Sequence, residues 1–267
     1  MSKKKIALVT GGAGFIGSHM VDLLLKKNIS VRVIDNFSGG HEKNLKQHLN
    51  NANLNIEKID ICNLKENKAI FKHLDYVFHF AGKGDIVPSI EQPYEYLNTN
   101  VIGTIKVLEC AKGSNIKKFL YAASSSCYGL AKTPTLETDS IQTLYPYALS
   151  KYQGEQCVLH WNKVYGLPSL SLRIFNAYGE RVRTTGAYGA VFGVFFKQKL
   201  EKQSYTIVGD GNQKRDFLYV TDVANAFLAG SQSKKSNQIY NLGAGEPQSI
   251  NRLVELIGEE YGKIYLP

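Results

Sequence analysis

The stretch Thr10-Gly11-Gly12-Ala13-Gly14-Phe15-Ile16-Gly17 decides the fold. It follows a short apolar run, 6–9, that is typical of a buried parallel strand, and it opens a segment, 14–27, with apolar residues at helical spacing. Glycines three residues apart permit a tight turn and let a pyrophosphate approach the backbone. The start of the helix offers unpaired N–H groups and a positive dipole to phosphate. The stretch therefore predicts a dinucleotide-binding turn that uses Gly11, Gly14, Phe15, Ile16 and Gly17.

The rest of the chain alternates strand-like apolar runs with helical segments. Strands are expected at 31–34, 54–59, 76–80, 118–122, 168–173, 205–208, 238–242 and 263–266, and helices at 41–49, 94–112, 147–165, 190–202 and 221–229. This order predicts an α/β fold, a Rossmann-type doubly wound parallel sheet with right-handed crossovers. We expect a Rossmann domain over 1–175 and a smaller C-terminal substrate lobe over 176–267, interleaved with the last elements of the sheet.

Composition and charge exclude several classes of protein. Within the 267 residues, no apolar run approaches the length of about 20 that spans a bilayer. The basic start, 3–5, precedes only four apolar residues, which argues against a signal peptide. The four cysteines lack CxxC or metal-ligand spacing, so we expect reduced thiols and no metal. The net charge of +9 suits an anionic small molecule or simply a lysine-rich surface. We expect a cytoplasmic protein that binds neither membrane nor nucleic acid.

Asp35 ends the second expected strand, at about the 20-residue distance from the glycines that ribose-binding carboxylates keep. Its carboxylate can accept hydrogen bonds from the adenosine ribose. It would also repel a 2′-phosphate, which favours NAD over NADP. The alternative is an ordinary loop aspartate after a strand.

Tyr147 and Lys151 stand one helical turn apart, so their side chains leave the same helix face. An ammonium beside a phenol favours the phenolate. Lowering a phenol pKa of about 10 by roughly three units takes about 4 kcal/mol, which a nearby cation in a partly dry site can supply. The pair predicts a tyrosine base, and a chance arrangement on a solvated helix is the alternative.

With further short motifs, these residues resemble the extended short-chain dehydrogenases/reductases of the NAD-dependent nucleotide-sugar epimerase/dehydratase family. The resemblance runs from Lys4 to Pro267. The segments that carry it are 10–17, His79-Phe80-Ala81-Gly82, Ser124-Ser125-Ser126, 147–151, Arg173-Ile174-Phe175-Asn176 and Arg215-Asp216-Phe217.

The resemblance implies roles for individual positions. The implied catalytic residues are Ser124, Tyr147 and Lys151, of which Tyr147 and Lys151 also contact NAD. Further implied cofactor contacts are Asp35, Asn36, Asp60, Ile61, Phe80, Ala81, Gly82 and Asn100. Implied substrate contacts are Lys83, Ser125, Ser126, Asn176 and Arg215. Alternatives stay open at three positions, since Asn100 can brace the sheet, Arg215 can pair with Asp216, and Lys83 can be merely solvated.

Ser125 and Ser126 bear on the type of reaction. The related 4,6-dehydratases carry Asp and then Glu at these positions, and the sugar-acid decarboxylases carry Glu at the second. A hydroxyl cannot replace a carboxyl as general acid or base. The resemblance therefore implies an NAD-dependent epimerase, an isomerase of a nucleoside-diphosphate sugar. UDP-hexose 4-epimerisation through a 4-keto intermediate is favoured. The alternatives are a nucleotide-sugar reductase, a 4,6-dehydratase and a non-catalytic NAD-binding sensor or scaffold.

Some positions depart from the family pattern. Ile174 stands where many epimerases carry Tyr, and the loop 180–189 is unusual, which leaves the sugar open. Family members usually continue beyond the position of Pro267, so we expect the substrate lobe to be incomplete. Relatives often form homodimers through a four-helix bundle, and the candidate interface residues here are Leu97, Val101, Ile105, Val158 and Trp161.

Overall fold

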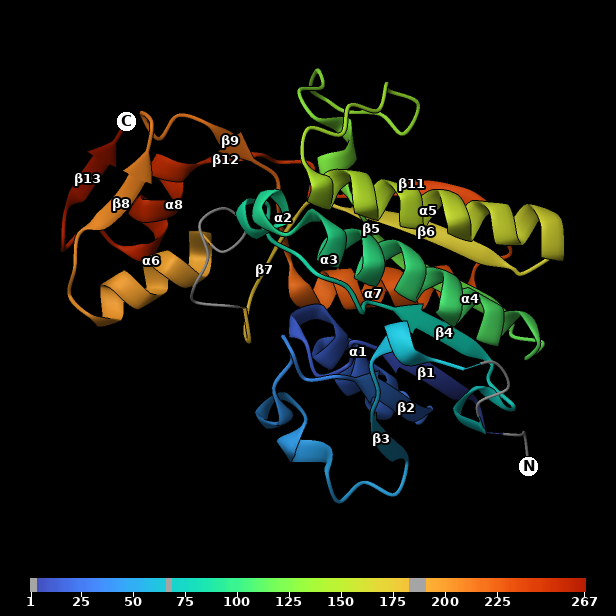
Figure 1. Cartoon of the computed structure of the whole chain (residues 1–267). Coiled ribbons are helices and arrows are strands. Elements are labelled where there is room, and N and C mark those ends of the chain that lie inside the picture. The colour runs from blue at the N-terminus through green and yellow to red at the C-terminus, as the bar shows by residue number, and fades with distance from the viewer. Residues whose placement is uncertain (1–3, 66–68, 183–190) are drawn as a thin grey trace.

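Seven parallel strands form the central sheet (Figure 1). The computed structural model describes residues 4–65, 69–182 and 191–267. The strands are β1 (Ile6–Thr10), β2 (Ser30–Asp35), β3 (Leu54–Lys58), β4 (Tyr76–His79), β5 (Lys118–Ser124), β6 (Ser169–Ile174) and β11 (Gln238–Leu242). They lie in the order β11-β6-β5-β4-β1-β2-β3, and every neighbouring pair is parallel. The prediction of a doubly wound Rossmann-type sheet is confirmed.

The central strands are apolar on both faces because helices cover both sides of the sheet. Successive residues of a strand point to opposite faces. Val77 and Phe78 on β4, like Phe119 and Leu120 on β5, therefore belong to two different hydrophobic cores. Two separate layers of side chains thus hold the ends of these strands in fixed positions.

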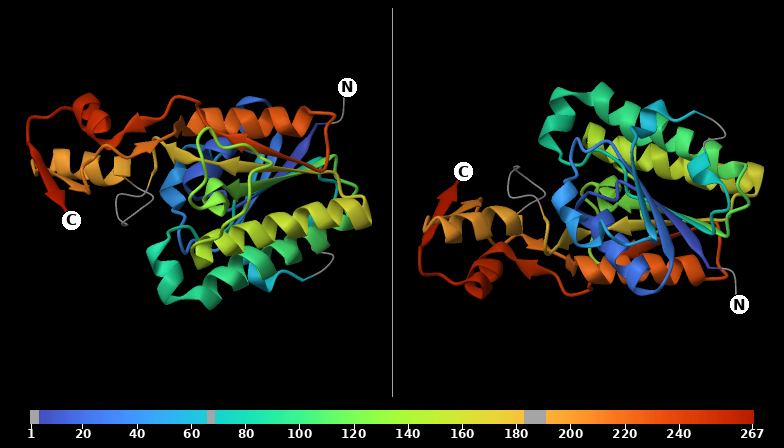
Figure 2. Two further views of the ribbon diagram at one scale, coloured as in Figure 1. Left: turned by 90° about the horizontal axis from the view of Figure 1, so that it is seen from above. Right: turned by 90° about the horizontal axis from the view of Figure 1, so that it is seen from below.

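Helices α1 (Phe15–Lys26) and α7 (Val220–Gln232) pack on one face of the sheet, and α4 (Thr104–Lys112) and α5 (Pro146–Tyr165) pack on the other (Figure 2). The helix expected over 94–112 consists of three successive segments, α3 (Pro93–Leu97), a π-helical turn (Asn98–Gly103) and α4. A π-turn inside a helix is a frequent feature of functional sites. Within the described residues, no helix has the length and apolar content needed to cross a membrane.

The expectation of a helix at 41–49 is wrong. Only two short 3₁₀ turns form there, Glu42–Asn44 and Lys46–His48. The segment instead covers the glycine turn, because the His41 N–H donates to the Ala13 carbonyl at 3.0 Å and Asn44 Nδ2 donates to the same oxygen at 2.8 Å. These contacts with the turn replace the regular bonds of a longer helix.

A smaller lobe lies beyond the carboxyl ends of the strands (Figures 1 and 2). It contains α6 (Val191–Leu200), β8 (Tyr205–Val208), α8 (Ile250–Ile257) and β13 (Lys263–Leu266), with its own core around Phe195 and Tyr205. Two short strand pairs join it to the sheet, β7 (Asn176–Tyr178) with β10 (Phe217–Tyr219), and β9 (Lys214–Arg215) with β12 (Gln248–Ser249). The boundary at residue 175 stays a prediction.

Candidate active site

The implied site residues follow the carboxyl ends of neighbouring strands. Thr10 ends β1, His79 ends β4 and Ser124 ends β5. The strand order reverses between β1 and β4, and open α/β sheets bind ligands in the crevice at such a point. Sequence positions more than 100 residues apart therefore meet at one edge of the sheet.

The glycine turn is shaped to receive phosphate. Gly11 adopts a positive φ of 67°. A side chain there would meet the Ala81 backbone N at 2.7 Å, and one at Gly17 would meet the Gly11 carbonyl O at 2.1 Å. No side chain caps the start of α1 at Gly14, so the first N–H groups of that helix can bind an anion. Phe15 and Ile16, half-buried, begin α1 directly after this turn. These features fit the pyrophosphate of a dinucleotide.

Asp35 lies buried behind the glycine turn. Its Oδ2 accepts a hydrogen bond from the Ala13 N–H at 2.9 Å, and Oδ1 accepts from the Phe37 N–H at 2.8 Å. A carboxylate has about four acceptor positions, so both oxygens retain capacity for ribose hydroxyls. Asp35 therefore holds the glycine turn in place and still has acceptor positions that suit ribose.

Asn36, the residue after Asp35, forms a polar pair with Asp60. Asn36 Nδ2 donates to Asp60 Oδ2 at 2.9 Å, and the Cys62 N–H donates to Oδ1 at 2.8 Å. Burial opposes ionisation of Asp60, but these hydrogen bonds outweigh it and hold the pKa of the carboxyl below its usual value. The side chain of Ile61 is buried against Gly103, so only its backbone is free to face a cofactor.

The loop that begins with Phe80, Ala81 and Gly82 is fixed by Asn100. The Lys83 N–H donates to Asn100 Oδ1 at 2.7 Å, while Asn100 Nδ2 donates to the Lys83 carbonyl at 3.0 Å and to Ser150 Oγ at 2.9 Å. Asn100 is 1% exposed, and its side chain braces this loop. Lys83 is held by an ion pair of 3.2 Å with Glu95.

A buried hydrogen-bond chain, which the sequence did not reveal, joins the glycine turn to the π-turn. Thr104 Oγ1 donates to the Asn100 carbonyl at 2.7 Å, so it accepts from His79 Nε2 at 2.9 Å. The Ala81 N–H donates to Thr10 Oγ1 at 3.1 Å, and Thr10 Oγ1 lies 2.6 Å from His79 Nδ1. These contacts fit a neutral His79 with its proton on Nε2.

Burial, with a smaller contribution from the Lys151 charge, lowers the pKa of His79 to about 3. The unfolded chain takes up a proton near pH 6.5, whereas the folded protein does not until about pH 3. We therefore expect stability to fall as the pH drops below 6.5, by about 2 kcal/mol at pH 5. Urea unfolding at pH 5 and pH 7.5 measures this. A His79→Asn variant should lose less stability over the same interval, and an equal loss in both proteins would contradict the assignment.

Tyr147 and Ser124 come together at the carboxyl end of β5, and Lys151 follows Tyr147 by one turn of α5. Burial raises the pKa of the Tyr147 phenol above its usual value, a hydrogen bond with Ser124 opposes this, and the nearby charge of Asp85 adds to the increase. Lys151 Nζ lies 4.5 Å from the centre of the Tyr121 ring, and burial lowers its pKa to about 8. In the protein alone, the pKa of Tyr147 therefore moves upward, opposite to the lowering that the Tyr/Lys spacing predicted.

Ser125 and Ser126 begin a 3₁₀ turn (Ser125–Tyr128) directly after Ser124. The Ser126 N–H donates to Ser124 Oγ at 3.2 Å, and Ser124 Oγ donates to Ser126 Oγ at 3.0 Å. Both serines are half-buried, so this turn presents hydroxyl groups beside Tyr147.

Asp85, whose charge raises the pKa of Tyr147, was not identified as a site residue from the sequence. It lies on the loop after Lys83 and has a positive φ of 72°.

Asn176 and Arg215 lie on the segments that join the sheet to the smaller lobe. Asn176 Nδ2 donates to the Asp216 carbonyl at 3.0 Å, and Arg215 is exposed, donating to the Lys214 carbonyl at 3.0 Å. The Asp216 carboxylate accepts from two backbone N–H groups instead of pairing with Arg215. Most of the unusual loop at 180–189 lies outside the described residues.

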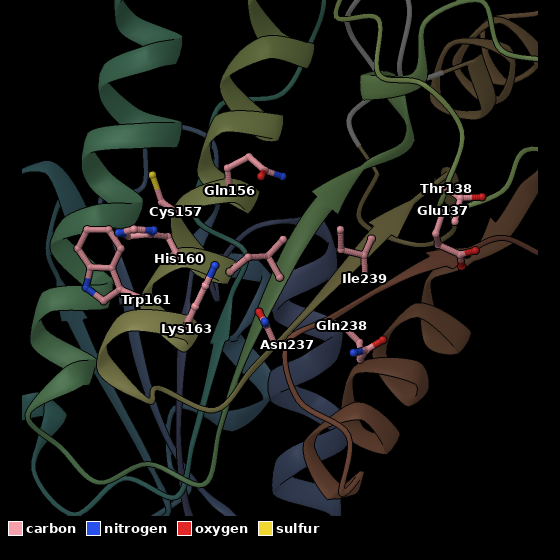
Figure 3. A pocket seen from close by; sticks show the side chains of 11 residues that line it. Glu137, Thr138, Gln156, Cys157, His160, Trp161, Lys163, Asn237, Gln238 and Ile239 are labelled. Atoms are coloured by element: carbon pink, nitrogen blue, oxygen red, sulfur yellow. The ribbon is translucent and has the colours of Figure 1, made fainter.

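A separate hollow of about 710 Å³ lies between α5 and β11 (Figure 3). Side chains of α5, such as His160 and Lys163, line one side, and 237–239 line the other. Burial raises the pKa of Cys157 in its wall, which disfavours a nucleophilic thiolate. None of the implied site residues lines this hollow.

Among the described residues, no group of three or more His, Cys, Asp or Glu side chains could hold a metal ion.

Comparison with known proteins gives consistent matches. Residues 7–243 match the model of the NAD dependent epimerase/dehydratase family. The chain is 40% identical over 257 residues to a putative UDP-glucose 4-epimerase of Methanocaldococcus jannaschii, covering 96% of this chain and 82% of that protein. It is also 33% identical over 259 residues to a UDP-N-acetyl-alpha-D-glucosaminuronate decarboxylase of Bacillus cytotoxicus, covering 94% and 79%.

A solved structure has the same fold. It is a UDP-N-acetylglucosamine 4-epimerase from Methanobrevibacter ruminantium in complex with UDP-N-acetylmuramic acid. It matches this chain with a TM-score of 0.93 at 35% sequence identity, over 99% of this chain and 86% of that one.

Proposed function

This chain belongs to the NAD-dependent epimerase/dehydratase family, and from that membership we propose that it inverts C4 of a UDP-hexose. NAD is the cofactor of the family. The observation that carries the proposal is the set of Ser124, Tyr147 and Lys151 beside a turn that holds serines, and no carboxylates, at 125 and 126. The relatives named as UDP-sugar 4-epimerases support it.

NAD, when bound, supplies a reversible acceptor for the hydride of C4. Tyr147 removes the proton of the 4-hydroxyl and later returns it, and Ser124 steadies that oxygen. Lys151, with a pKa of about 8, stays largely protonated at neutral pH. Because burial raises the pKa of Tyr147, the tyrosine needs this positive charge and that of the oxidised cofactor to act as a base.

The cofactor and substrate roles follow the geometry. Asp35 suits the adenosine ribose, and the glycine turn with the start of α1 suits the pyrophosphate. Asn176 and Arg215, at the entrance to the smaller lobe, would hold the diphosphate of the sugar nucleotide. Ser125, Ser126 and Lys83 would contact the sugar.

We expect purified protein to convert UDP-glucose into UDP-galactose without consuming added NAD. Chromatography and mass spectrometry of the products measure this conversion. A 4-keto-6-deoxy product would instead identify a dehydratase, and net oxidation of NADH would identify a reductase. Release of CO₂ from a UDP-uronic acid would identify a decarboxylase. Retention of NAD without turnover of any sugar nucleotide would favour a sensor or scaffold.

We also propose a homodimer formed through the outward faces of α4 and α5. Val158 does not belong to this surface, because it is fully buried in the core below α5. Apolar side chains do project outward from the same helical region, including Ile102, Leu149, Val164 and Tyr165. Exposed apolar surface of this kind is typical of protein interfaces. Sedimentation equilibrium would report a monomer if the proposal is wrong.

A further inference from the structure

Glu155 and Arg173 form an ion pair that is almost completely removed from solvent. Their side chains are 1% and 3% exposed. Arg173 Nη2 donates to Glu155 Oε1 at 2.6 Å, and Arg173 Nε donates to Oε2 at 3.0 Å. Ser171 Oγ donates to the same Oε2 at 2.8 Å. A bidentate pair of this kind fixes both the distance and the relative orientation of the two side chains.

Tyr128 continues the network. Arg173 Nη1 donates to the Tyr128 hydroxyl at 2.6 Å, and the guanidinium carbon lies 4.8 Å from the centre of the Tyr128 ring. The Tyr128 hydroxyl donates in turn to Asn241 Oδ1 at 2.7 Å on β11. Arg173 is therefore held by Glu155 on one side and by Tyr128 on the other, and all three side chains are buried.

The three residues come from the elements that carry the catalytic groups. Glu155 follows Lys151 by one turn of α5 and Tyr147 by two turns, so all three share one helix face. Tyr128 ends the 3₁₀ turn that begins directly after Ser124. Arg173 lies on β6, where its register partner on β5 is Ala123, the residue before Ser124.

We propose that Glu155, Arg173 and Tyr128 are positioning residues for the epimerisation, which hold Tyr147 and Lys151 on α5 in register with Ser124 at the end of β5. The inference rests on the proposed function. Without the network, α5 is joined to β5 by apolar packing, by the hydrogen bond of the Tyr121 hydroxyl to the Lys151 carbonyl and by that of Ser124 with Tyr147, none of which is a bidentate ion pair. A shift of about 1 Å between reacting groups can lower a rate by about 10²-fold.

Stability alone does not account for the pair. Removing two charges from water costs about as much free energy as their attraction returns, and apolar replacements of similar size are often equally stable. Removing one partner is different, because it leaves an uncompensated buried charge. The effect of the pair on catalysis can therefore be separated from its effect on folding by replacing both partners together.

The charge of Glu155 also acts on Lys151. The groups that act on this ammonium or lie beside it are Glu155 on its own helix, Tyr121 on β5 and neutral His79 on β4, and Asp85 acts on Tyr147. Burial lowers the pKa of Lys151, and the carboxylate of Glu155 opposes this effect. Glu155 thereby helps to keep Lys151 charged at neutral pH.

The first experiment compares the holoenzyme with the double variant Glu155→Leu/Arg173→Met and with each single variant. We expect both single variants to lose thermal stability and the double variant to recover most of it. In the double variant, kcat with UDP-glucose should still fall about 10²-fold, with KM changed by less than about threefold. A folded double variant with the parent kcat would overturn the proposal. Glu109→Gln, which removes the ion pair of Glu109 with Lys112 within α4, is the control and should keep the parent kcat.

The second experiment is independent of the sugar and therefore separates failure of the inference from failure of the proposed function. Titration of the Tyr147 phenol in the holoenzyme is followed by tyrosinate absorbance, as the difference from Tyr147→Phe. We expect Glu155→Leu/Arg173→Met to raise the pH at which Tyr147 ionises, because the hydrogen bond with Ser124 lowers the pKa of this phenol and is weakened when α5 shifts. Tyr128→Phe, a milder change that retains the ring, should move this titration less than the double variant. An unchanged titration in the double variant would overturn the positioning role even if the parent enzyme turned over no UDP-sugar.

Discussion

Replacing Tyr147 with phenylalanine should lower epimerase turnover by about 10³- to 10⁴-fold, the upper range for loss of a general acid–base group. The phenol is the group at this edge of the sheet that can both take and return the 4-hydroxyl proton. Ser124 can steady the oxygen, but a serine hydroxyl is too weak an acid to replace the phenol. The glycine turn and Asp35 are unchanged in the variant, so NAD should still be retained.

The measurement is the rate of interconversion of UDP-glucose and UDP-galactose, together with the absorbance of retained NAD. Tyr152→Phe provides a matched control, since Tyr152 is half-buried on the same helix one residue beyond Lys151. It should keep the parent rate. Turnover within tenfold of the parent in Tyr147→Phe would exclude the tyrosine as the base and leave the mechanism without its proton carrier.

Much of the fold could be predicted because local patterns and long-range packing agree in the sheet. The apolar runs of β1, β4 and β5 are buried on both faces, so their sequence shows the burial directly. At 41–49 the local pattern suggested a helix, but hydrogen bonds to Ala13 determined the conformation. Helix α8 was missed, although Ser249 caps it and its apolar residues have helical spacing.

Some residues implied for the site lie together, such as Ser124 with Tyr147 and Asn36 with Asp60, but the sequence could not define their environment. The spacing of Tyr147 and Lys151 fixes a common helix face and does not specify which neighbour each side chain meets. Tyr121, about 30 residues earlier in the chain on β5, lies under the Lys151 ammonium. Burial then reverses the expected direction of the Tyr147 pKa shift. Effects of this kind depend on distant strands and are not visible in a motif.

The same limit applies to Glu155 and Arg173. Glu155 lies one turn after Lys151, and Arg173 is the first residue of the recognised segment that ends at Asn176. Their pairing requires that α5 packs over β6 at one particular position along the strand. The available signal was an acidic residue at helical spacing from Lys151, and only the structure shows that this residue is buried and that Arg173 compensates its charge.

Replacing Gly17 with alanine should destabilise the protein by about 3 kcal/mol, the upper range for overpacking of a closely packed site. In an ordinary helix the same change would stabilise by about 0.5–1 kcal/mol. Here the new methyl group would lie 2.1 Å from the Gly11 carbonyl O and 3.0 Å from the Gly12 Cα. Gly11 has little room to retreat, because even a Cβ added to it would lie 2.7 Å from the Ala81 backbone N.

The glycine turn must therefore move as a unit, and it would carry away the N–H groups that suit the pyrophosphate. We expect a lower melting temperature by about 6–12 °C and loss of most of the retained NAD, measured by calorimetry and by absorbance of the released cofactor. Gly113→Ala is the matched control, because Gly113 has a negative φ at the end of α4 and no atom lies within 4 Å of the added methyl group. A Gly17→Ala protein that keeps both its melting temperature and its NAD would show that the turn can accommodate the added methyl group, contrary to these distances. The assignment of the pyrophosphate to the glycine turn would then fail.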